Sequence, residues 1–121
     1  MTTGVGIDII EVARIKGLIE KNPRFVQRIF TTQEISYCQE KKNKYQHFAA
    51  RFAAKEAFFK ALGRRIKWTD IGLINLSSGK PQLEIKDVKF KKKFSLDKIH
   101  VSIAHLSEYA VAVVILESAS Y

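Results

Sequence analysis

The sequence is poor in cysteine, proline and tryptophan and holds no long apolar run. Cys38 is the single cysteine in 121 residues, which excludes an intramolecular disulfide framework and suits the reducing cytosol. No segment approaches the roughly 20 apolar residues of a membrane-spanning helix. Asp8 and Glu11 interrupt the N-terminal apolar segment, so it lacks the pattern of a secretory signal. These features predict a cytoplasmic protein with no membrane partner, in which Cys38 packs rather than reacts.

Positive charge is what the chain has in excess. It carries 21 Lys+Arg against 12 Asp+Glu, a formal net charge of +9. Such a surface attracts an acidic partner, such as nucleic acid, an anionic membrane, a phosphorylated cofactor or an acidic protein. The length and the 46% hydrophobic content fit one domain spanning residues 1–121.

Helices are expected mainly in the first half of the chain and strands mainly in the second, which predicts an α+β fold. Thr31 and Glu34 have the spacing of a capping box, and Gly63 is placed to end the longest helix. Residues 86–94 hold five lysines and form either a short helix or an irregular basic segment. The helices are expected over residues 11–21, 23–30, 32–40 and 45–62, and the strands over 5–10, 71–76, 82–85, 99–104 and 109–116.

The longest predicted helix carries a carboxylate beside an apolar stripe. Glu56 lies at the edge of this stripe, where a charge costs free energy unless it is paired or bound to a cation. Lys60 follows one turn later. A carboxylate, a lysine and a glycine in this order suggest a site for a metal and a phosphate. At 100° per residue the stripe consists of Phe48, Phe52, Phe59 and Leu62.

A second carboxylate lies inside the first predicted strand. Alternation places Val5, Ile7 and Ile9 on one face and Gly6 with Asp8 on the other. Aspartate is depleted in strands, so its presence in an apolar run is unusual.

Together the two carboxylates suggest a magnesium site, because Mg²⁺ is usually held by one or two carboxylates, waters and phosphate oxygens. The alternative is that Asp8 caps a helix and that Glu56 forms a surface pair with Lys60. Nothing in the sequence decides whether Asp8 and Glu56 meet in space.

These residues carry a family resemblance. Residues 4–15, Gly-Val-Gly-Ile-Asp-Ile-Ile-Glu-Val-Ala-Arg-Ile, resemble the N-terminal signature of the holo-[acyl-carrier-protein] synthase family. Residues 52–61, Phe-Ala-Ala-Lys-Glu-Ala-Phe-Phe-Lys-Ala, resemble its second signature. Gly79-Lys80-Pro81 and residues 101–105 follow in the family's order. The resemblance spans nearly the whole chain, and the paired signatures at this separation make it specific.

The resemblance implies a 4′-phosphopantetheinyl transferase-like fold, with an antiparallel sheet packed on a long helix and additional N-terminal helices. It implies Mg²⁺-dependent transfer of the 4′-phosphopantetheine group from coenzyme A to a serine of apo-acyl carrier protein, a step of fatty acid biosynthesis. The by-product is adenosine 3′,5′-bisphosphate. The resemblance also implies a homotrimer, in which each active site is shared between neighbouring subunits.

The resemblance also implies the site residues. The metal positions fall on Asp8 and Glu56, and Glu56 either positions or deprotonates the serine. Lys60 aligns with a phosphate-contacting lysine, and His105 aligns with a histidine near the cofactor that either contacts phosphate or assists proton movement. Glu56, Lys60 and His105 are therefore the catalytic candidates. Without the resemblance, His105 is explained as a hydrogen-bonded histidine at a strand end. Further coenzyme A contacts are expected at Lys44, Arg51, Gly63, Ser77, Gly79, Lys80 and Pro81.

A basic face on the first predicted helix is a candidate docking surface for the carrier protein. Arg14, Leu18 and Lys21 recur at i, i+4 and i+7, and a leucine between two cations suits an acidic amphipathic helix. The alternative is a solvated basic face with one stray leucine. The full candidate docking set is Arg14, Leu18, Lys21, Arg24 and Arg28.

The chain departs from the family after the long helix. Gly63-Arg64-Arg65 stands where many members have glycine, a small residue and a second glycine. The arginines either replace a backbone phosphate site with side-chain contacts or are only exposed.

Two other functions compete with the transferase. A nucleic-acid-binding domain is supported by the charge and the basic run at 89–94. A noncatalytic protein-interaction module would use the Arg14 face alone. Both leave Asp8 and Glu56 without a role, and no nucleic-acid recognition motif accompanies the charge, so nucleic acid is not expected as a partner.

Overall fold

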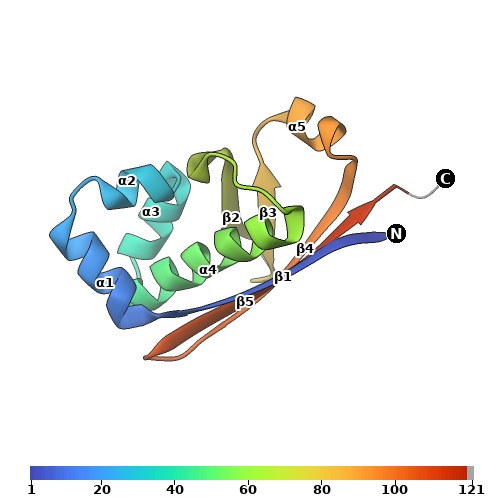
Figure 1. The fold of residues 1–121 in the computed structure, drawn as a ribbon. Coiled ribbons are helices and arrows are strands. Elements are labelled where there is room, and N and C mark those ends of the chain that lie inside the picture. The colour runs from blue at the N-terminus through green and yellow to red at the C-terminus, as the bar shows by residue number, and fades with distance from the viewer. Residues whose placement is uncertain (120–121) are drawn as a thin grey trace.

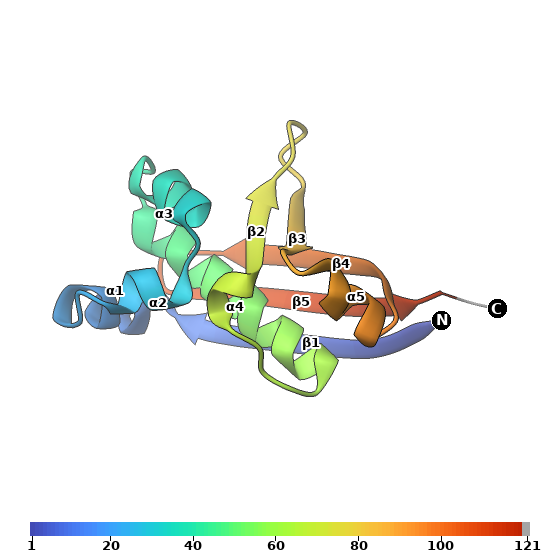
Figure 2. The ribbon, with the colours of Figure 1, turned by 90° about the horizontal axis from the view of Figure 1, so that it is seen from above.

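The computed structural model describes residues 1–119 and places one long helix across an antiparallel sheet (Figures 1 and 2). The helix, α4, spans Lys44–Leu62. A three-stranded sheet has the order β1-β5-β4, and a separate two-stranded sheet pairs β2 with β3. The predicted α+β fold is confirmed. The strands are β1 (Thr2–Glu11), β2 (Ile71–Asn75), β3 (Pro81–Ile85), β4 (Leu96–His105) and β5 (Tyr109–Ser118).

The remaining helices lie toward the two ends of α4 (Figure 1). Three of them, α1, α2 and α3, gather near its N-terminal end. The basic segment at 86–94 forms a short helix, α5, which lies over the other end of the sheet (Figure 2). None of the helices in residues 1–119 combines the length and apolar character needed to cross a bilayer. Their bounds are α1 (Val12–Lys21), α2 (Phe25–Ile29), α3 (Thr32–Gln39), the 3-10 helix η1 (Trp68–Asp70) and α5 (Val88–Lys93).

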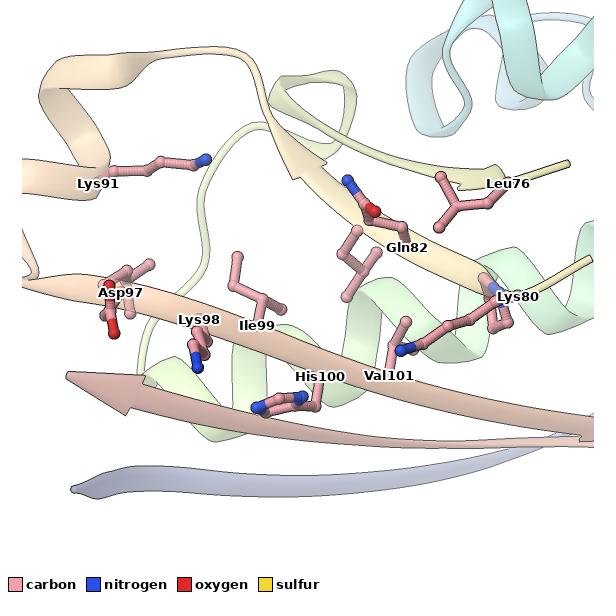
Figure 3. Close-up of a pocket in the computed structure, with 12 residues that line it drawn as sticks. Leu76, Lys80, Gln82, Lys91, Asp97, Lys98, Ile99, His100 and Val101 are labelled. Carbon is pink, nitrogen blue, oxygen red and sulfur yellow. The ribbon is translucent and has the colours of Figure 1, made fainter. Parts of the chain in front are cut away.

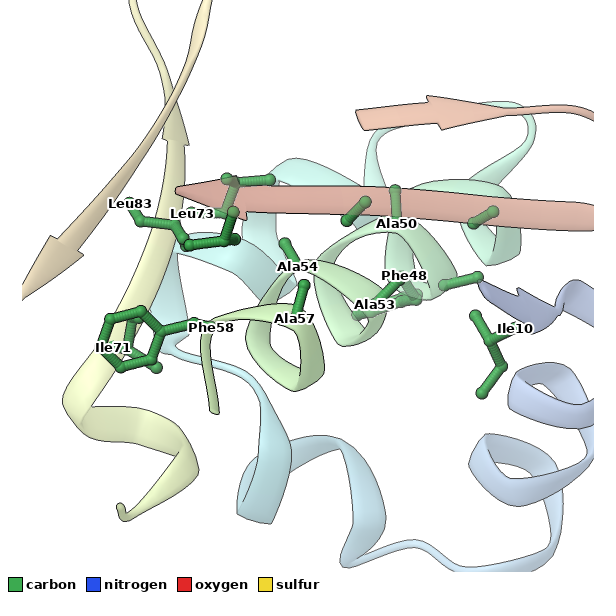
Figure 4. Packing of buried hydrophobic residues seen from close by; sticks show 14 of the residues in the cluster. Ile10, Phe48, Ala50, Ala53, Ala54, Ala57, Phe58, Ile71, Leu73 and Leu83 are labelled. Carbon is green, nitrogen blue, oxygen red and sulfur yellow. The ribbon is translucent and has the colours of Figure 1, made fainter. Parts of the chain in front are cut away.

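Helix α4 is buried on more than its aromatic side (Figure 4). Burial extends beyond the predicted stripe, because Ala53, Ala54 and Ala57 are also fully buried. Two members of the predicted stripe, Phe52 and Leu62, are only partly buried. The physical reason is that α4 lies between the three-stranded sheet and a second layer formed by α3 and β2, so it has no broad solvent face.

Two glycines let β1 approach the backbone of α4. A Cβ added at Gly6 would lie 2.0 Å from the carbonyl oxygen of Ala57, and one at Gly4 would lie 2.0 Å from that of Ala61. Any larger residue would therefore push the helix off the strand. The face of β1 that bears Gly6 and Asp8 is the face against α4. The opposite face carries Val5, Ile7 and Ile9, which are 62%, 62% and 65% exposed.

The residues predicted to begin α3 and to end α4 do so in the structure. Thr31 caps α3 through the backbone N–H of Glu34, and the Glu34 carboxylate accepts from the Thr31 N–H, completing the capping box. Gly63 ends α4 in the left-handed region at φ 84°. Cys38 is buried, as expected, and burial raises the pKa of its thiol to about 12.

A buried ion pair joins α3 to α4. The Lys55 ammonium lies 2.6 Å from Glu34 Oε1, and neither side chain is exposed to solvent. Lys55 also donates to the carbonyl oxygens of Ile29 and Trp68, at 2.8 and 3.1 Å. Glu34 Oε2 accepts from the backbone N–H of Leu73 at 2.9 Å. Burial lowers the pKa of Lys55, and the Glu34 carboxylate opposes that shift.

Candidate active site

The two candidate metal ligands come together where β1 crosses α4. Asp8 lies within β1 on the face against the helix, so it does not cap a helix. Lys60 donates to Asp8 Oδ1 at 3.1 Å and to the carbonyl oxygen of Ile7 at 3.0 Å. The close approach of strand and helix at Gly6 is what places the Asp8 carboxylate beside this part of α4.

Glu56 pairs with Arg65 and not with Lys60. Arg65 Nη1 lies 2.9 Å from Glu56 Oε1, and Nη2 lies 3.3 Å from Oε2. The surface pair between Glu56 and Lys60 considered from the sequence is therefore wrong. The lysine turns toward β1 because the Asp8 carboxylate and the Ile7 carbonyl together attract its ammonium.

The electrostatics show that the two carboxylates influence each other. Burial raises the pKa of Asp8, and the Glu56 charge raises it further. The Lys60 and Arg14 charges pull the pKa of Asp8 back down. Two partly buried carboxylates that repel each other form a site where a cation is stabilised.

The donor set fits a hard divalent cation. Within residues 1–119 no three His, Cys, Asp or Glu side chains gather as a ready-made metal cage. Two carboxylates that leave places for water and phosphate oxygens match the way Mg²⁺ is usually bound. Asp8 and Glu56 would hold the ion, and it would supply charge neutralisation at a bound pyrophosphate.

A second polar group surrounds Arg51, on the N-terminal half of α4. Arg51 is buried, and its guanidinium donates to Asn75 Oδ1 at 2.8 Å. Asn75 Nδ2 in turn donates to the carbonyl oxygen of Gly79 at 3.2 Å, which ties Arg51 to the turn between β2 and β3. The Arg51 guanidinium also lies 4.2 Å from the centre of the Tyr37 ring, and its Nε has no hydrogen-bond partner within residues 1–119.

His105 belongs to this second group. Its Nδ1 lies 2.8 Å from Gln46 Oε1, and its ring centre lies 4.9 Å from that of His47. Because an amide oxygen only accepts, His105 donates from Nδ1 to Gln46. Asn43 Nδ2 donates to the same Gln46 oxygen at 3.3 Å, which fixes the orientation of the amide. Burial and the His105 charge lower the pKa of His47 to about 4, so His47 is neutral at physiological pH.

The two polar groups are separate within one chain. Along α4, Glu56 follows Arg51 by five residues and Gln46 by ten, which corresponds to about 8 Å and about 15 Å along the helix axis. The structure therefore brings Asp8, Glu56 and Lys60 together in one place. It gathers Arg51, His105 and the 77–81 turn in another.

The 77–81 turn projects from the three-stranded sheet (Figure 2). Its end borders a hollow of about 430 Å³ between β3 and β4, into which Lys80 reaches from one side (Figure 3). Lys91 and Lys98 add further cationic groups to the lining, and His100 adds an imidazole ring. Gly79 has φ 90°, so turn geometry by itself accounts for that glycine. Ser77 is exposed on this turn.

The other predicted contacts are distributed around these groups. Lys44 lies at the start of α4, with its ammonium 5.2 Å from the Tyr45 ring centre. Gly63 lies at the C-terminal end of the same helix, after Glu56 and Lys60. The docking candidates Arg14, Leu18, Lys21, Arg24 and Arg28 are all exposed.

Sequence reasoning missed the residues that orient the candidates. Asn75 and Gln46 hold Arg51 and His105, and Arg65 holds Glu56. A polar side chain ending the apolar strand at 71–75 was a signal for Asn75. Gln46 carried no such signal, because surface helices are commonly polar. Arg65 was singled out together with Arg64, but as a phosphate contact or an exposed side chain and not as the partner of Glu56.

Comparison with known proteins identifies the family of the chain. Residues 4–114 match the sequence model of the 4′-phosphopantetheinyl transferase superfamily. The holo-[acyl-carrier-protein] synthase of Clostridium tetani is 48% identical over 122 residues, covering 97% of each chain.

Solved structures give the same result. One is a holo-(acyl-carrier-protein) synthase from Bacillus anthracis in complex with CoA (3′,5′-ADP), which has a TM-score of 0.83 at 37% identity. The match covers 98% of this chain and 99% of that chain. The holo-[acyl-carrier-protein] synthase of Neisseria meningitidis has a TM-score of 0.90 at 30% identity, with 98% of this chain and 100% of that chain covered.

The fold and the paired signatures thus define an enzyme of the phosphopantetheinyl-transferring class. The chain belongs to the 4′-phosphopantetheinyl transferase superfamily, within its holo-[acyl-carrier-protein] synthase branch. The family and enzyme class predicted from the sequence are confirmed.

Proposed function

We propose that this protein transfers the 4′-phosphopantetheine group of coenzyme A to a serine hydroxyl of apo-acyl carrier protein in the cytoplasm, with Mg²⁺ as cofactor. The convergence of Asp8 and Glu56, with Lys60 between strand and helix, carries the proposal. In the reaction the serine oxygen forms a bond to the phosphorus that bears the pantetheine arm. The pyrophosphate bond to the other phosphorus breaks, and adenosine 3′,5′-bisphosphate leaves.

The chain's own residues have distinct roles in this proposal. Asp8 and Glu56 bind the cation, and Glu56 also orients the serine hydroxyl or accepts its proton. Lys60 stabilises the charge that develops on the phosphate. The complex of the Bacillus anthracis relative with CoA (3′,5′-ADP) supports coenzyme A as the donor.

The second polar group is proposed to hold the nucleotide end of coenzyme A. Arg51 and His105 offer cationic and hydrogen-bonding groups, and Asn75 connects Arg51 to the turn. Lys44 and the 77–81 turn, with Ser77, Gly79, Lys80 and Pro81, are assigned to the same end of coenzyme A. Gly63 is assigned to the pyrophosphate part of coenzyme A, near Asp8 and Glu56.

The test is the intact mass of a purified apo-acyl carrier protein after incubation with this protein, coenzyme A and Mg²⁺. We expect a gain of one phosphopantetheine group, which is lost with a chelator and when the carrier serine is replaced by alanine. A known transferase run on the same substrate is the positive control. If only the control modifies the carrier protein, the proposal fails for that partner, and nucleic-acid binding is the function to test next.

We also propose that the protein assembles as a homotrimer that completes the site from two subunits. The separation of the two polar groups supports a shared site, and the family resemblance supplies the stoichiometry. The exposed side chains of Val5, Ile7 and Ile9 lie beside Val111, Val113 and Ile115 of β5 in the strand register. A continuous apolar sheet face of this kind is typical of an interface.

Replacing Ile7 with glutamate is expected to dissociate the assembly and abolish transfer, because it places a charge in the middle of the apolar sheet face. Analytical ultracentrifugation measures the mass, which we expect to be that of a trimer for the natural sequence and of a monomer for Ile7→Glu. Val88→Glu is the matched control, since Val88 is 65% exposed on α5, away from this face. A natural chain that sediments as a monomer and still transfers would contradict the shared site.

The carrier protein is proposed to dock on α1. Arg14, Leu18 and Lys21 form one exposed face, with Arg24 and Arg28 following on the next turn and helix. Arg14 is close enough to Asp8 to lower the pKa of its carboxyl. A domain docked here therefore presents its serine beside Asp8 and Glu56.

Reversing the charge of Arg14 is expected to lower kcat/KM for the carrier protein by about 10-fold, because an acidic partner is steered by this face. The dependence of kcat/KM on salt should become shallower as well. Lys93→Glu on α5 makes the same change in net charge at a distant exposed position and should have little effect. Equal losses in the two variants would show that only the overall charge matters.

A further inference from the structure

The loop that follows α4 returns a cation onto a proposed metal ligand. Gly63 ends the helix with a positive φ and turns the chain, so that Arg65 reaches back to Glu56. The guanidinium contacts both carboxylate oxygens, at 2.9 and 3.3 Å. It therefore covers the same oxygen atoms that a divalent cation would use.

Aromatic rings hold Arg65 in this place. Its guanidinium lies 5.5 Å from the ring centre of Phe59 and 5.6 Å from that of Trp68. The Arg65 side chain is nevertheless 63% exposed, whereas that of Glu56 is 16% exposed. The arginine is thus positioned but not trapped, and it can leave without unpacking the core.

We propose that Arg65 is a displaceable counter-ion, which competes with the divalent cation for Glu56 and then pairs with the pyrophosphate of coenzyme A. The inference rests on the proposed function and adds the coupling between its two ligands. Arginine stays protonated at any physiological pH, so it cannot yield Glu56 by losing its proton and has to move. A guanidinium released beside a metal-bound phosphate finds a planar bidentate partner there.

The consequence is that the cation and coenzyme A bind cooperatively. The cation alone has to displace Arg65 and gains nothing from the displaced guanidinium. When coenzyme A is also present, the displaced arginine gains the phosphate as a new partner. By linkage, each ligand then strengthens the binding of the other.

The first measurement is the affinity of the protein for Mn²⁺ in the absence of coenzyme A. Electron paramagnetic resonance detects the Mn²⁺ that remains unbound. Arg65→Met is expected to bind Mn²⁺ about 5-fold to 10-fold more tightly than the natural chain, because Glu56 no longer has a competing cation. Arg64→Met is the matched control. It removes the same charge from the neighbouring residue, whose guanidinium lies 5.3 Å from the Phe94 ring centre. Equal affinities for the natural chain and Arg65→Met, or equal gains in both variants, would overturn the inference.

The second measurement is coenzyme A binding by calorimetry with Mn²⁺ present. Arg65→Met is expected to bind coenzyme A about 10-fold more weakly, even though it binds Mn²⁺ more tightly. Weakening of both ligands would point to a damaged fold and would count against the inference.

A Glu56→Gln variant separates this inference from the proposed function. If Glu56→Gln loses Mn²⁺ binding and Arg65→Met shows no increase in Mn²⁺ affinity, the metal site is supported and the proposed role of Arg65 is refuted. If Glu56→Gln binds Mn²⁺ as the natural chain does, the metal site itself fails and takes the inference with it.

Discussion

Replacing Glu56 with glutamine is expected to lower the rate of phosphopantetheine transfer by about 10³-fold, a loss of the size seen when one preorganised electrostatic group is removed from an active site. Glutamine keeps the size of the side chain and removes its charge. Asp8 would remain as the single carboxylate beside Lys60. On the proposed mechanism, the cation would lose one of its two carboxylate ligands, and the serine would lose the side chain that orients it or accepts its proton.

The same change should leave the fold nearly unaffected. The pair that it removes, between Glu56 and Arg65, has a largely exposed arginine, and such pairs contribute about 1 kcal/mol or less. Rates follow from the intact mass of the carrier protein over time, and stability follows from urea unfolding. Glu84→Gln is the control, because Glu84 is an exposed carboxylate on β3. A Glu56→Gln variant that keeps more than about a tenth of the natural rate would contradict the proposed mechanism.

Replacing Lys55 with methionine is expected to lower the free energy of unfolding by about 3–5 kcal/mol, because it leaves the buried Glu34 carboxylate without its counter-charge. The pair is fully enclosed, and its atoms also satisfy the carbonyls of Ile29 and Trp68 and the N–H of Leu73. One lysine therefore holds α2, α3, η1 and β2 around α4. Methionine fits the same space but offers none of these hydrogen bonds.

Lys60 provides the comparison for this prediction, since it lies on the same helix and is also ion-paired. Its side chain is 54% exposed, so Lys60→Met should change the free energy of unfolding by about 1 kcal/mol or less. Urea unfolding at one fixed protein concentration measures both variants, which keeps any assembly the same. Similar losses for the two lysines would show that burial is not what gives Lys55 its importance. In that case, the ion pair with Glu34 would not organise the core.

Lys55 also shows why a signature residue need not contact the substrate. It precedes Glu56 in the second signature, yet its side chain points into the core while that of Glu56 points to the site. Consecutive helix residues are 100° apart, so the signature combines a structural lysine with a proposed catalytic carboxylate.

The sequence by itself determined the features that depend on neighbouring residues. The capping box of Thr31 and Glu34, the helix end at Gly63 and the alternation within β1 all follow from spacing over a few residues. The family was also readable, because its two signatures are short and continuous. Each of these predictions rests on interactions within one helix, strand or turn.

Only the tertiary structure decided which face of an element is covered and which charges meet. Alternation separates Ile7 from Asp8, but the close approach of α4 over Gly6 determined that the aspartate faces the helix and the isoleucine faces outward. Glu56 and Lys60 are neighbours along the helix, yet each pairs with a residue from elsewhere, because ion pairs form where backbone packing brings opposite charges together. Charge partners across 52 and 9 residues are set by that packing, and no local pattern encodes them.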